Sequence, residues 1–234
     1  MEELILISDI HGNAEAVRRV VEAHGRDKEY IILGDIMGLL SKPKRTLDHV
    51  QDVGTVVLSG NHDKAIFEKG SGDVGSPALS KFEYEHTMSN LSDKEQIYMR
   101  QLPHLNKFSR DDATICAAHA RPSPEMASGY EQGNSGVPKR EVPEVAARVA
   151  SYYDYVFLGH THEQYAIDCS KWGHDVQFVN PGSLGYCHTY ANLDVDTGNV
   201  LLKQVDVDQE TVKDHVREVM PDSMPHVDGW LSES

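Results

Sequence analysis

The chain has 234 residues, 39% of them hydrophobic, and a formal net charge of −15. This length fits one large domain with its own core, and the acidic balance argues against nonspecific binding to nucleic acid or to an anionic membrane. No apolar stretch approaches the ~20 residues that are needed to cross a bilayer.

Five short apolar runs predict buried strands. They are continuous rather than alternating, which is typical of strands covered on both faces in a layered α/β fold. In chain order they lie at residues 4–7, 30–33, 56–58, 114–118 and 155–158. Helical patterns separate several of these strands: one helix begins after Asn13 and ends at Gly25, and two more are predicted over 44–53 and 140–152.

The segment 64–110 is more polar than its surroundings and predicts a helical insertion. Two helices are expected within it, over 78–89 and from Asp93 to Gln101, the second capped by Ser92. The C-terminal third predicts a hairpin turn at Thr197-Gly198, a helix over 210–219 and four strands, at 164–168, 175–179, 190–196 and 199–207. We expect a single domain over residues 1–234, with a loose tail from residue 221.

Polar residues that can bind metal follow each of the five predicted strands. In an open α/β sheet the carboxyl ends of the strands gather at one edge, where ligands bind. In an extended segment the side chains of residues i and i+2 point to the same side. The side chains of Asp9 and His11 should therefore lie on one side of the chain, and so should those of His160 and His162. We expect one crevice to collect Asp9, His11, Asp35, Asn61, His62, His119, His160 and His162.

The donors in this set are carboxylate, imidazole and amide groups. Such donors suit Mn²⁺, Fe, Ni²⁺, Co²⁺ or Zn²⁺. Even without His62, the seven remaining candidate ligands are too many for one ion; they suit two divalent ions that share Asp35 as a bridge, roughly 3.5–4 Å apart. Two such ions would also supply a local positive field for a phosphate in an acidic protein. The competing interpretation for His160 and His162 taken alone is an ordinary loop.

The motifs occur in the order of a known family. Asp9-x-His11, Gly34-Asp35, Gly60-Asn61-His62-Asp63, His119 and Gly159-His160-x-His162 resemble the calcineurin-like metallophosphoesterase superfamily, and its small bacterial and archaeal phosphoesterases in particular. The resemblance covers about residues 4–205 and implies a four-layer α/β/β/α sandwich with two mixed β-sheets. It assigns Asp9, His11 and His162 to one metal and Asn61, His119 and His160 to the other. It makes Asp35 the bridge and leaves His62 as a non-ligand histidine beside the phosphate.

The chain also departs from the family pattern. The usual His-Gly motif is replaced by His119-Ala120-Arg121, and the segment after Asn180-Pro-Gly-Ser183 differs from that of many small relatives. The chain reads GDIMGLL and GNHD where protein Ser/Thr phosphatases carry their own signatures. A protein phosphatase is therefore less expected, and the loops at 64–110 and 121–139 are expected to form the rim that selects the substrate.

The implied function is hydrolysis of a phosphodiester or phosphomonoester bond by a metal-bridging hydroxide, with Mn²⁺ as the first choice of metal. Asn61, His62 and Arg121 are predicted to bind the substrate. His62, oriented by Asp63, is predicted to stabilise the developing charge or to protonate the leaving alkoxide. Two alternatives stay open: a nucleotide-polyphosphate hydrolase or nuclease of the same superfamily, and a non-catalytic scaffold of the same fold.

The remaining expectations concern partners and location. The partner is expected to be a small phosphate ester, with neither a membrane nor long nucleic acid, while the oligomeric state is left open. Cys116, Cys169 and Cys187 form no C-x-x-C pair, and the N-terminal MEELILISD lacks the cations of an export signal. These features predict a cytoplasmic protein. His188 is a weaker site candidate that follows the Asn-Pro-Gly-Ser segment.

Overall fold

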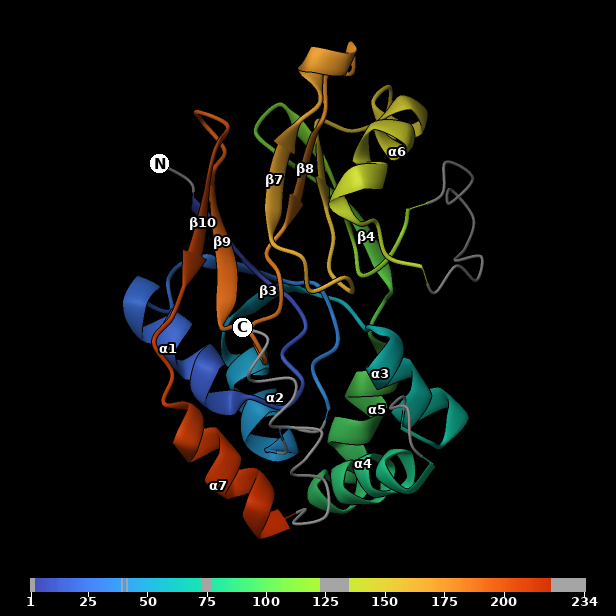
Figure 1. Cartoon of the computed structure of the whole chain (residues 1–234), viewed down its shortest axis with the longest axis vertical. Coiled ribbons are helices and arrows are strands. Elements are labelled where there is room, and N and C mark those ends of the chain that lie inside the picture. Colours follow the sequence, from blue (N-terminus) through green and yellow to red (C-terminus); the bar gives the residue numbers. More distant parts are fainter. Residues whose placement is uncertain (1–2, 39, 41, 73–76, 123–134, 220–234) are drawn as a thin grey trace.

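Two five-stranded mixed sheets form the centre of the protein, and helices cover their outer faces (Figure 1). The computed structural model of the chain describes residues 3–38, 40, 42–72, 77–122 and 135–219. The first sheet has the order β10-β9-β1-β2-β3. Its strands are β1 (Glu3–Ile7), β2 (Glu29–Ile32), β3 (Gly54–Val57), β9 (Thr189–Asp194) and β10 (Asn199–Gln204).

Parallel pairing joins β1, β2 and β3, so their carboxyl ends lie at one edge of the first sheet. The second sheet has the order β4-β5-β6-β8-β7, and in it β5, β6 and β8 are parallel. Its strands are β4 (Leu105–Arg110), β5 (Ala113–Ala118), β6 (Tyr155–Phe157), β7 (Tyr165–Asp168) and β8 (Gln177–Asn180). Each sheet therefore presents one set of parallel strand ends.

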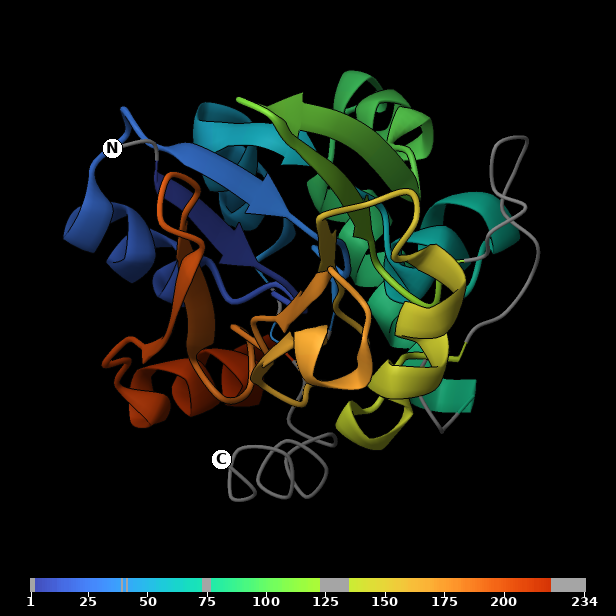
Figure 2. The same ribbon diagram turned by 90° about the horizontal axis from the view of Figure 1, so that it is seen from above.

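Three apolar clusters separate four layers. Leu4 and Leu6 of β1 pack between the two sheets, with Ile115 of β5 and Phe157 of β6 among their neighbours. The alternate residues of β1 face the outer cluster that holds α1 (Ala14–His24) and α2 (Pro43–Val53). A third cluster fills the space between the second sheet and α6 (Val142–Val149). The protein is thus a four-layer α/β/β/α sandwich, as the view from above shows (Figure 2).

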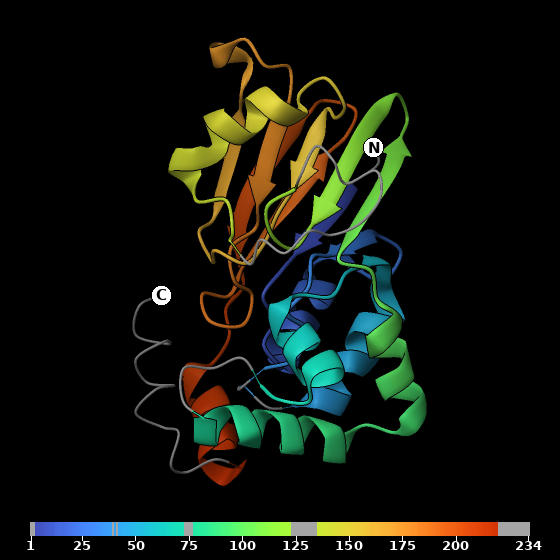
Figure 3. The ribbon, with the colours of Figure 1, turned by 90° about the vertical axis from the view of Figure 1, so that its right-hand side faces the viewer.

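A helical segment lies beside the strand ends (Figure 3). It follows β3 directly and contains α3 (Asn61–Lys64), one π-helical turn (Ala65–Lys69), α4 (Pro77–Asn90) and α5 (Asp93–Gln101). The Glu95 carboxylate accepts hydrogen bonds from the backbone N–H and the hydroxyl of Ser92, which fixes the start of α5 at the expected residue. The helical insertion expected over 64–110 ends earlier than predicted, because Leu105–Arg110 is an edge strand of the second sheet.

The other elements lie close to their predicted ranges. Asn13 accepts the Ala16 N–H at the start of α1, and Gly25 ends that helix with a φ of 85°. The hairpin turn before β10 contains Gly198, and α7 (Gln209–Val219) follows β10. The tail from residue 221 and residues 123–134 of the expected rim lie outside the described ranges. No helix within those ranges is long and apolar enough to cross a membrane.

Candidate metal centre

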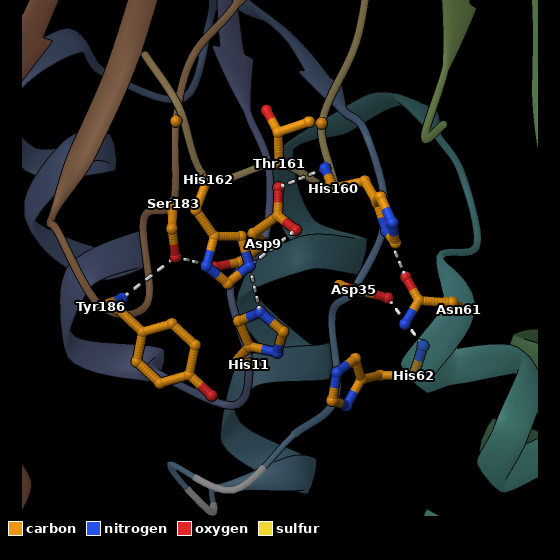
Figure 4. A network of polar contacts seen from close by, with 12 residues as sticks. Asp9, His11, Asp35, Asn61, His62, His160, Thr161, His162, Ser183 and Tyr186 are labelled. Atoms are coloured by element: carbon orange, nitrogen blue, oxygen red, sulfur yellow. Dashed lines mark hydrogen bonds and ion pairs between the residues drawn. The ribbon is translucent and has the colours of Figure 1, made fainter. Parts of the chain in front are cut away.

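All seven predicted ligands meet where the strands of the two sheets end. Figure 4 labels all of them except His119. Asp9 and His11 follow β1, and Asp35 follows β2. Asn61 is the first residue of α3, directly after β3. His119 follows β5, while His160 and His162 follow β6. The parallel order of β1, β2 and β3, and of β5 and β6, explains why these distant segments converge.

The ligand-bearing turns are backbone-strained. Among the described residues, seven non-glycine residues have a positive φ, and five of these are predicted ligands: Asp9, His11, Asp35, His160 and His162. Such conformations cost about 1–3 kcal/mol each and persist only where the surroundings hold them. Backbone hydrogen bonds do so here, since Asp9 N–H donates to the Gly34 carbonyl and His11 N–H to the Asp35 carbonyl. Strain concentrated at one place marks a functional site.

Two glycines allow the carboxylates to reach the turns of neighbouring motifs. The Asp35 Oδ1 atom accepts the His62 N–H at 2.8 Å, and the Asp9 Oδ2 atom accepts the His160 N–H at 3.0 Å. A Cβ atom on Gly60 would lie 2.7 Å from the Cγ atom of Asp35, and one on Gly159 would lie 2.9 Å from the Asp9 Oδ2 atom. A side chain at either position would therefore displace a carboxylate.

Asp9, His11 and His162 form the first donor group. Their ligand atoms all lie within 4.8 Å of one another. The Nε2 atoms of His11 and His162 are 3.1 Å apart, and the His162 Nε2 atom is 3.3 Å from the Asp9 Oδ1 atom. Two ring nitrogens this close need a proton or a cation between them, because two lone pairs repel each other. The group therefore fits a shared metal ion.

Asp35, His119 and His160 form the second donor group, with Asn61 beside them. The Asn61 Oδ1 atom lies 3.1 Å from the His119 Nε2 atom and 2.7 Å from the His160 Nδ1 atom. The His119 Nδ1 atom is 2.7 Å from the Leu33 carbonyl. Since a carbonyl can only accept, Nδ1 carries the proton, and Nε2 is left to bind metal.

A third grouping overlaps both of these. His11, Asp35 and His62 also place one donor atom each within 4.8 Å of one another. The rings of His11 and His62 meet edge to face with centroids 4.8 Å apart. His62 thus lies against the centre, and distance alone does not separate it from the ligands.

Comparison with known proteins decides the family. The family model of the calcineurin-like phosphoesterase superfamily domain matches residues 2–198. The chain belongs to this superfamily. An uncharacterized protein of Methanocaldococcus jannaschii is 25% identical over 167 residues, which are 68% of this chain and 62% of that protein. The chain thus aligns with less than two thirds of that relative's length.

Two solved structures share the superfamily fold. A metallophosphoesterase from Sphaerobacter thermophilus has a TM-score of 0.74 and 22% identity, and the match covers 96% of this chain and 98% of that one. A hypothetical protein from Pyrococcus horikoshii has a TM-score of 0.75 and 18% identity, with 97% and 98% covered. At these identities the likeness establishes the fold and nothing finer.

Burial and neighbouring charges shift the pKa values of the ionisable groups in the calcineurin-like centre. Burial alone would raise the pKa of Asp35, but the positive charges of His119 and His62 hold it well below its usual range. Burial, with the charge of His62, lowers the pKa of His11 to about 3. Burial opposes the charged form of His119, but Asp35 outweighs it and raises the pKa of His119 to about 9. Protons therefore occupy part of this site, and a metal that bound these donors would have to displace them.

Two predicted roles are not supported by the geometry. Asp63 is buried, and its carboxylate accepts the backbone N–H groups of Ile36, Met37 and Gly60. It ties the turn after β2 to the turn after β3, and these contacts do not orient the His62 ring. The Arg121 guanidinium pairs with Glu141 and lies 3.5 Å from the Gly136 carbonyl, so its described contacts lie outside the donor groups.

Tyr186 is one residue that sequence reasoning missed. The Tyr186 ring stacks on the His11 ring, with centroids 4.6 Å apart (Figure 4). The Ser183 hydroxyl donates to the Asp9 carbonyl at 3.0 Å and accepts the Tyr186 N–H at 3.2 Å. The Asn180 amide donates to the Gly159 carbonyl. The Asn-Pro-Gly-Ser segment thus builds one wall of the centre, and the aromatic residue three positions beyond it was the available signal.

Glu83 is the second residue that sequence reasoning missed. Its Oε1 atom lies 3.0 Å from the His62 Nδ1 atom, and its side chain is completely buried. It comes from α4, within the helical segment. A single glutamate in a polar helix gives no local sign of such a role. His188, the weaker candidate, is also buried, and its backbone carbonyl accepts the Val205 N–H of the segment after β10.

Proposed function

We propose that the protein is a metal-dependent phosphoric ester hydrolase with a two-ion centre. The observation that carries this proposal is the meeting of seven predicted ligands, from five separate strand ends, in two donor groups that adjoin at Asp35. A scaffold of the same fold has no need to hold strained residues and two histidine nitrogens 3.1 Å apart in this arrangement. The proposal therefore favours the enzyme over the scaffold.

In this proposal Asp9, His11 and His162 hold one ion, and Asn61, His119 and His160 hold the other, with Asp35 shared. When bound, a pair of divalent ions supplies a hydroxide nucleophile near neutral pH and positive charge for the phosphate oxygens. Mn²⁺ is the first candidate, and Fe, Ni²⁺, Co²⁺ and Zn²⁺ suit the same donors.

The chain itself supplies the proton for the leaving group. The His62 side chain is 14% exposed, so one edge of its ring is open to a substrate while the other faces Glu83. A proton on the His62 Nε2 atom would pass to the leaving oxygen as the bond between phosphorus and that oxygen breaks. Asn61, which precedes His62 in the chain and whose amide contacts His119 and His160, would orient a phosphate oxygen.

A phosphodiester is the substrate class that the charges favour. Arg121 is paired with Glu141, so its positive charge is already balanced. Bound ions and His62 then carry the positive charge that faces the substrate. A diester has one negative charge and needs less compensation than a monoester, which has two. We place the protein in the cytoplasm with a small phosphate ester as its partner.

The direct test is turnover by the metal-free protein after addition of each divalent ion. Bis(p-nitrophenyl) phosphate and p-nitrophenyl phosphate compare a diester with a monoester, and mass spectrometry counts bound metal. We expect hydrolysis of the diester with Mn²⁺ and two ions per chain. Asp35→Asn should abolish turnover and lower the metal count, while Asp48→Asn on the exposed side of α2 should change neither. Two bound ions with no turnover of any ester would favour the scaffold.

A further inference from the structure

The Glu83 carboxylate is fully buried and lies within hydrogen-bond distance of the His62 ring. Its Oε1 atom is 3.0 Å from the His62 Nδ1 atom, and the Glu83 side chain has no exposed surface. Burying a carboxylate costs several kcal/mol unless a charged or hydrogen-bonding partner compensates it. The His62 Nδ1 atom, at this distance, is such a partner.

The surrounding helix and loop hold this carboxylate in place. Glu83 and Thr87 lie one helical turn apart on the buried face of α4, whereas Glu85 lies on the exposed face and pairs with Lys81. Gly72 N–H donates to the Ser80 carbonyl, which brings the preceding loop onto α4. A Cβ atom at Gly72 would lie 2.9 Å from the Glu83 Cβ atom. The packing leaves Glu83 little freedom to turn away from His62.

The residue next to His62 in the chain does not compete for this role. Both oxygens of Asp63 are occupied by backbone N–H groups of the turns after β2 and β3. His62 itself is anchored on the other side by its backbone, because its N–H donates to the Asp35 Oδ1 atom. The contact with Glu83 fixes the side toward which the His62 Nδ1 atom faces.

We propose that Glu83 is the positioning residue for His62, and that the helical segment belongs to the catalytic machinery through it. This inference rests on the proposed phosphoesterase function. Glu83 accepts the Nδ1–H of His62 throughout the reaction, so the second proton of the imidazolium sits on Nε2. As water gives up one proton to the solvent and its oxygen bonds to phosphorus, the ester P–O bond breaks, its electron pair stays on the leaving oxygen, and the Nε2 proton neutralises that oxygen. His62 ends as the neutral ring, still bonded to Glu83.

The test uses leaving groups of graded basicity. A series of aryl methyl phosphates runs from p-nitrophenol, whose anion leaves without a proton, to phenol, which needs one. Glu83→Gln should lower kcat about 10–100-fold for the phenol ester, because it removes part of the rate increase of about 10²–10⁴-fold that a positioned general acid contributes. For the nitrophenol ester, kcat should fall only ~3-fold or less. Glu85→Gln is the matched control, since it removes the same charge from the exposed face of α4 and should leave the whole series unchanged.

Two further measurements separate positioning from folding and from loss of the proposed function. In a His62→Ala background, Glu83→Gln should cause no additional loss of kcat, because its effect passes through that ring. Long-range ¹H–¹⁵N spectra of the metal-free protein should show a protonated His62 Nδ1 in the wild type and in Glu85→Gln, and an altered one in Glu83→Gln. Equal losses along the ester series, or an unchanged His62 signal, would overturn the inference. A wild type that hydrolyses no ester overturns the proposed function instead, while the spectra still decide the contact.

Discussion

Adding one methyl group at Gly60 tests the geometry of the centre most directly. Gly60 has a φ of −100°, so alanine fits the backbone, and any effect of Gly60→Ala comes from space. The new Cβ atom would lie 2.7 Å from the Cγ atom of Asp35, and real Cβ atoms essentially never lie within 3.0 Å of a neighbour. The new Cβ atom would lie closer still to the Asp35 backbone nitrogen, so the turn after β2 must shift together with the Asp35 carboxylate, the proposed bridge between the two ions.

The size of the effect follows from that displacement. A shift on the order of 1 Å in a reacting group can cost about 10²-fold in rate. We therefore expect kcat/KM for a phosphodiester to fall about 10²-fold or more in Gly60→Ala, with weaker metal binding. Overpacking of this kind costs about 1–3 kcal/mol, which lowers Tm by roughly 2–12 °C for a chain of this size. The protein should thus stay folded at room temperature.

The assay compares turnover, metal content and thermal unfolding of the same preparations. Gly173→Ala is the control, because no atom lies within 4 Å of its new Cβ and its φ of 81° adds only backbone strain. That variant should lose about 1–2 kcal/mol of stability and keep full activity. If Gly60→Ala binds metal and turns over like the wild type, Asp35 is not the shared ligand and the proposed centre is wrong.

Three further predictions concern side chains in and around the core. His62→Ala should keep its full metal content and lose about 10²–10⁴-fold in kcat; unchanged turnover would remove this ring from the mechanism. His119, with its pKa raised to about 9, carries a proton at neutral pH, so metal binding should release that proton and tighten as the pH rises from about 6 to 8. Calorimetry in buffers of different ionisation enthalpy measures this release, and a flat affinity contradicts it. Burial raises the pKa of Cys116 to about 12 and of Cys169 to about 11, so a thiol reagent at mildly alkaline pH should label Cys187 alone in the native protein, as peptide mass spectrometry would show.

The edge strand β4 shows where local pattern fell short. Its sequence, Leu105-Asn-Lys-Phe-Ser-Arg110, is largely polar and follows two predicted helices, so the pattern assigns it to the predicted helical insertion. The strand forms because it pairs along its whole length with β5 across the turn at Asp111 and Asp112. The Asp111-Asp112 pair was a local signal for a hairpin, because aspartate favours turns and tolerates the left-handed conformation that Asp111 adopts, with a φ of 48°. An edge strand needs few apolar residues, and periodicity alone therefore misses it.

His62 shows the same limit within the site. The sequence predicts that its neighbour Asp63 orients it, because the two residues are adjacent in the chain. The chain direction at the start of α3 instead turns Asp63 toward the backbone of the turns after β2 and β3. The His62 Nδ1 atom instead contacts Glu83, which lies 21 positions away on a helix whose buried face is set by packing.

The sequence by itself determined the chemistry and the place of the centre. Its continuous apolar runs define parallel strands, strand ends must gather at one sheet edge, and the ligand types stand at those ends. Only the tertiary structure decided how the two sheets face each other, which places the loops after β1 to β3 against those after β5 and β6. It also decided the left-handed turns of the ligands, the covering tyrosine and the buried glutamate. These depend on packing between residues far apart in the chain, and no local preference encodes such contacts.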